Sequence, residues 1–131
     1  MTKIFITKFD YDRLTKLIGK KKTLDDFDRA LLAELKKGKI VEPKDIPEDA
    51  ITMNSLVKFT DETQKELEYW LVFPEDADIS QGKISVLSPI GCALLGYKIG
   101  DAITLHTPQG RKDLTVKEVI HQPEREGKFD L

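Results

Sequence analysis

The spacing of apolar residues changes once along this chain, and that change constrains the fold more than any other feature. Before residue 41, apolar side chains recur at helical intervals, as in Leu24, Phe27 and Leu31. The segment 41–51, VEPKDIPEDAI, then brings two prolines and five charged residues. From residue 51 onward, apolar and polar residues alternate, as in strands. The pattern predicts an α+β protein with a helical arm at 1–42 and a second domain, with a mostly antiparallel sheet, at 43–131.

Two helices of about 12 residues, each roughly 18 Å long, are predicted in the arm. Thr7 is the expected N-cap of the first helix, with Asp10 three residues further on. Thr23 is the expected N-cap of the second helix, with Asp26 three residues further on. Glycines supply the stops of both helices, at Gly19 and Gly38. The arm is therefore predicted to be an antiparallel hairpin whose tip lies between the first glycine and Thr23.

The second domain is predicted to contain five strands and one short helix. Its expected strands are ITMNSLVKF (51–59), KELEYWLVF (65–73), ISVL (84–87), DAITLHT (101–107) and KDLTVKEVIHQ (112–122). The expected turns are TDETQ (60–64) and PQGR (108–111). A helix of two turns is expected to begin at Pro89, and a single helical turn at Pro43, because proline is favoured at the first helical position.

Charge is divided unevenly between the two parts. Residues 1–41 carry 11 Lys or Arg and 6 Asp or Glu, a net charge of +5, whereas residues 42–131 carry 10 and 17, a net charge of −7. No window approaches the roughly 18 apolar residues of a transmembrane helix. The N-terminus MTKIFITKFD places charges where a signal peptide has its apolar core. The single cysteine, Cys92, suits a reducing compartment. A cytoplasmic protein without a membrane partner is expected.

Few residues in the chain are suited to catalysis. Cys92 with His106 or His121 would form a thiol nucleophile and its base. Cys92 lies in the apolar run IGCALLG, however, where a free cysteine usually packs as a small hydrophobic residue. The two histidines lack metal-ligand spacing, and the glycines of IGCALLGYKIG match no phosphate-binding motif. We therefore expect a protein that is not an enzyme and has no metal or cofactor.

The predicted hairpin tip concentrates charged residues of both signs. They are Lys20, Lys21, Lys22, Asp25, Asp26 and Asp28. One interpretation is a solvated tip whose aspartates are favoured near a helix N-terminus. The other is a tip that contacts a charged partner. Direct binding to nucleic acid is not expected, because the sequence lacks interleaved aromatic residues and a net basic fold.

Several motifs together resemble one known family. The basic hairpin and proline-rich connector precede ITMNSLVKF, ISVLSPIGCALLGYKIGDAITLHTPQG and LTVKEV. This combination resembles the GreA/GreB family of bacterial RNA polymerase secondary-channel factors, and within it the short-hairpin branch called Rnk, regulators of nucleoside diphosphate kinase. The similarity is densest over residues 43–123 and weaker over the hairpin. SPIGCALLG followed closely by GD, with TPQG before the last strand, is specific as a combination.

The resemblance implies an FKBP-like C-terminal domain that docks on the rim of the polymerase secondary channel. The Ser-Pro loop of that domain contacts the polymerase in the family, which corresponds here to Ser88 and Pro89, with Ile90 and Gly91 shaping the loop. Leu87 stands where Gre factors often have an acidic residue. An FKBP-like fold alone does not indicate prolyl isomerase activity, because the sequence shows no signature of an aromatic-lined pocket.

The resemblance also bears on the hairpin. Gre factors carry a long coiled coil whose tip carboxylates help to hold a catalytic metal ion in the polymerase active site. Asp25 and Asp26 lie near the tip here, but helices of roughly 18 Å look too short to reach that centre. We expect a transcription regulator that does not stimulate transcript cleavage. In this reading Lys20, Lys21 and Lys22 are further candidates for contacts by the hairpin tip. The alternatives are a cleavage factor that uses Asp25 and Asp26 to position a metal ion, and a regulator that binds a nucleoside-metabolism enzyme.

Overall fold

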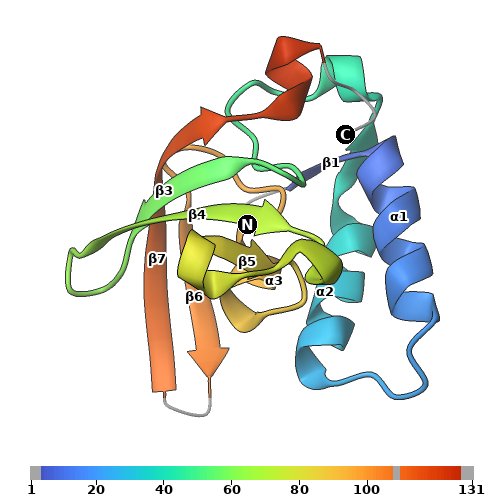
Figure 1. The fold of residues 1–131 in the computed structure, drawn as a ribbon, viewed down its shortest axis with the longest axis horizontal. Helices are drawn as coiled ribbons and strands as arrows, with labels where there is room; N and C mark the ends of the chain where they lie inside the picture. The colour runs from blue at the N-terminus through green and yellow to red at the C-terminus, as the bar shows by residue number, and fades with distance from the viewer. Residues whose placement is uncertain (1–3, 108–109, 128–131) are drawn as a thin grey trace.

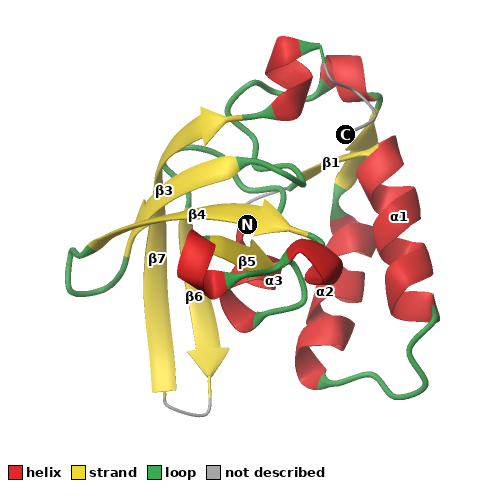
Figure 2. Ribbon diagram, viewed as in Figure 1, coloured by secondary structure: helices red, strands yellow, loops and turns green. Residues whose placement is uncertain are grey.

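The chain folds into a helical hairpin that lies beside a five-stranded sheet (Figure 1). The computed structural model describes residues 4–107 and 110–127. The strands of the sheet follow the order β5-β4-β3-β7-β6, and a separate two-stranded sheet, β1-β2, joins the ends of the hairpin. Figure 2 shows the three α-helices gathered on one side of the large sheet. The predicted α+β class, with its N-terminal hairpin, is confirmed.

The helices and strands have the following bounds. The helices are α1 (Lys8–Gly19), α2 (Asp26–Lys37) and α3 (Pro89–Leu94). The strands are β1 (Phe5–Thr7), β2 (Lys39–Val41), β3 (Leu56–Thr60), β4 (Glu66–Val72), β5 (Lys83–Ser85), β6 (Ala102–Thr107) and β7 (Gly110–His121). The connections contain short 3₁₀ turns, at Pro43–Asp45, Pro74–Asp76, Ile79–Gln81 and Pro123–Glu126. None of the helices in the described part of the chain has the length and apolar character that a membrane crossing requires.

The two hairpin helices begin at different kinds of cap. Thr7 caps α1 as predicted, because its Oγ1 accepts a hydrogen bond from the backbone N–H of Asp10 at 3.1 Å. The prediction for α2 is wrong: its N-cap is Asp25 and not Thr23. Asp25 Oδ1 accepts from the N–H of Asp28 at 2.8 Å, and Asp28 Oδ2 accepts from the N–H of Asp25 at 3.1 Å. This reciprocal capping box satisfies two backbone donors at once, which the threonine two residues earlier does not do.

The parallel pair β1-β2 was absent from the sequence prediction. Its register runs from Phe5 opposite Lys39 to Thr7 opposite Val41. Each strand has three residues, which is too short for an alternating pattern to stand out. The pair brings the beginning of α1 and the end of α2 together at the base of the hairpin, where Gly38 is the C-cap of α2 as predicted.

The large sheet is antiparallel except for the β4–β5 pair, which is parallel. The strand predicted at 51–59 is shorter in the structure, because residues 51–55 form a buried turn and β3 begins only at Leu56. Within this turn the Thr52 N–H donates to Ser55 Oγ at 3.1 Å, and Asn54 adopts a positive φ of 66°. The predicted turn at 108–111 falls partly on residues 108–109, which lie outside the described residues.

One hydrophobic core joins the hairpin to the sheet. Buried side chains from both parts belong to it, including Leu14, Ile18, Leu31, Leu35, Phe59, Leu71, Leu94 and Leu114. Helix α3 packs between α2 and strands β5 and β6. The division into parts 1–42 and 43–131 remains a prediction, and the shared core means that the hairpin depends on the sheet for the burial of its apolar face.

Candidate docking loop and hairpin tip

The Ser-Pro segment, Ser88–Gly91, forms a tight loop between β5 and the first turn of α3. Ser88 is the N-cap of α3, and its Oγ accepts from the Gly91 N–H at 3.1 Å. The same hydroxyl donates to the Ser85 carbonyl oxygen at 2.6 Å, and the Ser88 N–H donates to that oxygen at 3.0 Å. Pro89 occupies the first helical position, as predicted. Ser88 therefore fixes the shape of the loop, with its hydroxyl proton already donated inside the protein.

Gly91 is a steric requirement of this loop. A Cβ added to it would lie 2.0 Å from the Ser85 carbonyl oxygen and 2.9 Å from Ser88 Oγ. The first of these neighbours is backbone, so the clash cannot be relieved by a side-chain rotation. Leu87 and Ile90, which flank Ser88 and Pro89 in the sequence, are half-buried and pack against the core. The part of the loop left for a partner is thus a small, rigid surface with apolar edges and backbone groups.

Cys92 follows this loop and is unsuited to nucleophilic catalysis. Its side chain is buried, and burial, together with the negative charge of Asp25, raises the pKa of the thiol to about 11. A thiol with that pKa is protonated at neutral pH, whereas the nucleophile is the thiolate. The interpretation of Cys92 as a core residue agrees with this environment. The influence of Asp25 also indicates that the start of α2 lies close to α3.

The hairpin tip is held by an ion pair. Lys21 Nζ lies 2.5 Å from Asp28 Oδ2, and the Asp28 side chain is fully buried. Burial acts to raise the pKa of Asp28, but the hydrogen bonds from Lys21 and from the Asp25 N–H outweigh it, so the pKa is lowered. Lys20 and Lys22 are exposed, and neither forms an ion pair with any described residue. Of the three tip lysines, Lys21 is held in an ion pair within the tip, whereas Lys20 and Lys22 are not.

The tip carboxylates are mostly engaged in holding the hairpin. Asp25 caps α2, and Asp28 completes the capping box and pairs with Lys21. Asp26 is 98% exposed and lies 3.4 Å from the guanidinium of Arg29. In the described ranges, 4–107 and 110–127, no three or more His, Cys, Asp or Glu side chains are grouped so that they could hold a metal ion. The tip therefore presents two exposed carboxylates, of which Asp25 caps α2 and Asp26 does not, rather than a metal-binding cluster.

Comparison with known proteins identifies the family. Residues 46–121 match the family described as "Transcription elongation factor, GreA/GreB, C-term". The chain belongs to the GreA/GreB family. Residues 2–41 match the domain described as "Rnk N-terminus", so the hairpin is of the Rnk type. The resemblance that the sequence motifs indicated is confirmed over both parts of the chain.

Individual relatives agree with this assignment. The chain is 39% identical over 104 residues to the "Regulator of nucleoside diphosphate kinase" of Escherichia coli K12, covering 78% of this chain and 76% of that protein. It is 40% identical over 90 residues to GreA of Prosthecochloris aestuarii, covering 66% of this chain and 56% of that protein. A solved structure of a GreA/GreB factor from Nitrosomonas europaea has a TM-score of 0.76 at 37% identity, covering 92% of this chain and 100% of that one.

This GreA/GreB family member also has a polar contact that the sequence did not reveal. Asp10, in the first turn of α1, is buried, and its Oδ2 accepts from the Met53 N–H at 3.1 Å. Its Oδ1 accepts from Arg13 Nη2 at 2.6 Å. The Arg13 guanidinium lies over two rings, 4.0 Å from the Phe9 centroid and 4.5 Å from the Phe73 centroid. We call Asp10, Arg13 and Met53 the hairpin latch, because they tie α1 to the turn before β3.

A second carboxylate, which is half-buried, lies near the hairpin latch. Glu124 Oε1 accepts from Thr52 Oγ1 at 2.7 Å. Burial raises the pKa of Glu124, and the charge of Asp10 adds to that effect. Burial likewise raises the pKa of Asp10, although its hydrogen bonds from Met53 and Arg13 oppose the shift. In the sequence Asp10 is visible only as a residue of a helical first turn, and a partner 43 positions away leaves no local signal.

Proposed function

We propose that this chain binds RNA polymerase through the loop Ser88–Gly91, at the rim of the secondary channel, and regulates transcription elongation without catalysis of its own. The observation that carries the proposal is the family match over residues 46–121, which contains the whole loop. The rigidity of the loop supports it further. Gly91 and the Ser88 hydrogen bonds hold the loop in one shape before a partner arrives, which lowers the entropic cost of binding.

We further propose that the hairpin does not stimulate transcript cleavage. A hard divalent ion needs several oxygen ligands, and Asp25 and Asp28 are engaged in capping α2 and pairing with Lys21. Helices of 12 residues span only about 18 Å. The matches to two GreA relatives cover 56% and 54% of the length of those proteins. A short hairpin in which only one exposed carboxylate, Asp26, is not used for capping suits occupation of the channel entrance rather than delivery of metal ligands to a distant centre.

Direct binding to purified core RNA polymerase tests the docking proposal. We expect Pro89→Ala to weaken binding at least tenfold, about 1.4 kcal/mol, while the protein stays folded because Ser88 still caps α3. Lys112→Ala, an exposed site on β7, is the matched control and should bind as the wild type does. Equal binding by wild type and Pro89→Ala would place the interface elsewhere. No binding by the wild type would reject the proposal.

A cleavage assay on backtracked elongation complexes tests the role of the hairpin. We expect transcript cleavage at the intrinsic rate of the polymerase, with and without this chain. An Asp26→Asn variant is informative because Asp26 is the exposed tip carboxylate that does not cap α2. Stimulation by the wild type that disappears in Asp26→Asn would favour the alternative of a cleavage factor.

The name of the Escherichia coli relative favours a second candidate, in which the partner is a nucleoside diphosphate kinase. The binding experiment described for core RNA polymerase, repeated as a pull-down with that purified enzyme, separates the two candidates. Retention of the kinase, together with no retention of polymerase, would favour regulation of nucleoside metabolism by direct contact. Polymerase binding alone would favour the transcription role.

A further inference from the structure

A hollow on the large sheet shares no lining residue with the docking loop or the hairpin tip. It has a volume of about 470 Å³, within the range of small-molecule sites. The residues that line it are Asn54, Trp70, Val72, Asp76, Lys83 and His121. We propose that this hollow, the Trp70 pocket, binds a nucleoside phosphate, with the base against Trp70, the phosphate at Lys83 and the sugar hydroxyls or base amine at Asp76. This site is independent of the proposed contact with polymerase.

The aromatic wall of the Trp70 pocket follows from strand register. Lys83, Trp70, Leu56 and His121 are neighbours in turn across β5, β4, β3 and β7. The ring centroids of Trp70 and His121 are 5.4 Å apart at an interplanar angle of 60°. The backbones of β4 and β7 are separated by two strand spacings, about 9.6 Å, so the two side chains must lean toward each other over Leu56. The indole is thereby supported in one orientation, and a flat, half-exposed ring accepts any base by stacking.

Two charged side chains of the Trp70 pocket, Lys83 and Asp76, form no ion pair with any described residue. Asp76 is exposed on the 3₁₀ turn after β4. An ammonium group binds phosphate as a point charge. A carboxylate accepts hydrogen bonds from hydroxyl and amine groups. The hollow thus has one ammonium group and one carboxylate beside an indole, which match a ligand that carries both an anion and hydrogen-bond donors.

Asn54 adds a group that can read the edge of a base. The Asn54 N–H donates to the Leu71 carbonyl oxygen at 2.6 Å, and its φ of 66° is in the left-handed region. Asparagine tolerates that conformation better than most residues. Its side-chain amide offers both a donor and an acceptor at the rim of the pocket. His121, on the opposite wall, has its Nδ1 3.4 Å from Glu126 Oε2, which orients the imidazole.

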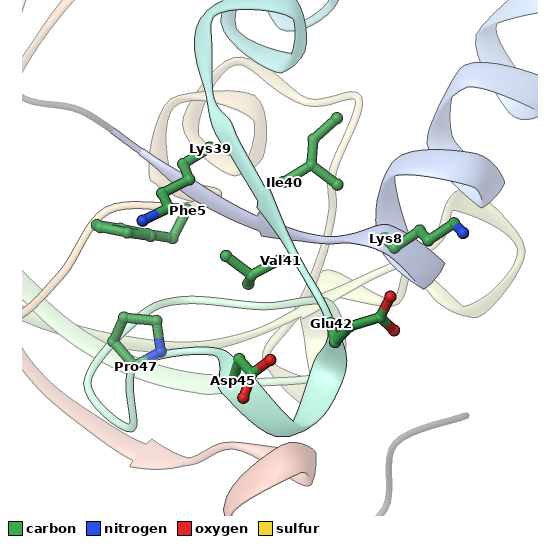
Figure 3. A pocket seen from close by; sticks show the side chains of 8 residues that line it. All are labelled: Phe5, Lys8, Lys39, Ile40, Val41, Glu42, Asp45 and Pro47. Carbon is green, nitrogen blue, oxygen red and sulfur yellow. The ribbon is translucent and has the colours of Figure 1, made fainter.

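A second hollow, at the base of the hairpin, is less suited to this ligand. It has a volume of about 530 Å³ and includes Phe5 and Lys39 (Figure 3). The Phe5 ring already carries two ammonium groups, with Lys39 Nζ 6.0 Å and Lys98 Nζ 5.1 Å from its centroid. A base would have to displace these cations in order to stack. The lysines of this site lie beside the carboxylates Glu42 and Asp45, and the site therefore provides a control for a charged hollow whose aromatic ring is already occupied.

The intrinsic fluorescence of Trp70 tests the proposal, because it is the single tryptophan of the chain. The probes are ADP, GDP, adenosine and inorganic phosphate, with correction for light absorbed by the bases and with calorimetry in parallel. We expect saturable quenching by ADP or GDP, and binding of adenosine or phosphate alone at least about tenfold weaker. The Lys83→Gln and Asp76→Asn variants should each weaken binding of the diphosphate about tenfold, and Lys83→Arg should restore it.

Control variants make the test decisive. Lys39→Ala and Lys112→Ala should bind the diphosphate as the wild type does, because both lie outside the Trp70 pocket. Loss of binding in Lys39→Ala but not in Lys83→Gln would overturn the proposal by moving the site to the hairpin base. No saturable binding at millimolar diphosphate would overturn it outright. Quenching by a proline-rich peptide but not by a nucleotide would also overturn it, since the pocket would then bind peptide. Circular dichroism on each variant establishes that the fold is retained.

Discussion

The loop before α3 and the tip before α2 both start a short helix, but they are held by different interactions. The loop depends on shape: Gly91 lets the chain pass so close to the Ser85 carbonyl oxygen that an added Cβ would lie 2.0 Å from it. The tip depends on charge, through the Asp25–Asp28 capping box and the Lys21 ion pair. Steric fit is unaffected by pH or salt, whereas carboxylate contacts depend on ionisation. The difference is consistent with the proposed docking role of the loop, and it makes the stability of the hairpin tip dependent on pH and salt.

Replacing Gly91 by alanine should have the largest effect. The new methyl group would meet backbone, so we expect Gly91→Ala to lower the free energy of unfolding by about 3 kcal/mol. Gly19→Ala is the matched control, because an added Cβ there meets nothing within 4 Å. It should raise stability by about 0.5 kcal/mol by restricting the unfolded chain. Urea denaturation of both variants measures the contrast, and equal midpoints would show that the loop can rearrange.

Removing the buried carboxylate of the tip should have the next largest effect. Asp28→Ala deletes the capping box and the partner of Lys21, and we expect a loss of about 2 kcal/mol. Asp26→Ala, at a position that is 98% exposed, should stay within about 0.5 kcal/mol of the wild type. The same urea experiment compares the two. A loss of similar size in both variants would mean that first-turn charge, and not the buried pair, stabilises α2.

The sequence predicts those elements whose causes are local. The start of α3 at Pro89 with its serine cap, the stop of α2 at Gly38 and the alternating strands all follow from residues within a few positions of one another. The error at Thr23 is also local: two candidate caps lie two residues apart, and the reciprocal Asp25–Asp28 box satisfies more backbone donors. Local patterns therefore predict that a helix begins here more reliably than which residue caps it.

The features that the sequence does not predict depend on contacts between distant positions. Asp10 bonds to Met53, and the strands β1 and β2 pair across the whole hairpin. Gly91 is visible in the sequence as a glycine of an apolar run, but its necessity arises from the Ser85 carbonyl oxygen of another element. The Trp70 pocket likewise depends on strand register, which places His121 beside a residue that is 51 positions earlier in the chain. These contacts can be inferred only once the strand order and register are known.

The hairpin latch should respond to pH with the opposite sign from the tip, and this is the smallest expected effect. The pKa of Asp10 is raised above its ordinary 3.8, so the folded state holds this proton more tightly than the unfolded state. Its contribution is complete below that value and is lost as the pH rises through the folded-state pKa. The pKa of Asp28 is lowered, so its contribution is complete above 3.8 and is lost as the pH falls through the folded-state pKa.

The pH dependence of unfolding separates these two signs. Between neutral pH and about pH 4, the wild type should gain stability relative to Asp10→Asn/Glu124→Gln, in which neither position can ionise. The difference between the wild type and Asp28→Ala should stay constant over the same range and shrink only in stronger acid, because Asp28 remains ionised until then. Urea midpoints measured at intervals of pH test both expectations. Parallel profiles for the wild type and the double variant would show that Asp10 and Glu124 reach solvent, in which case the latch does not depend on their protonation.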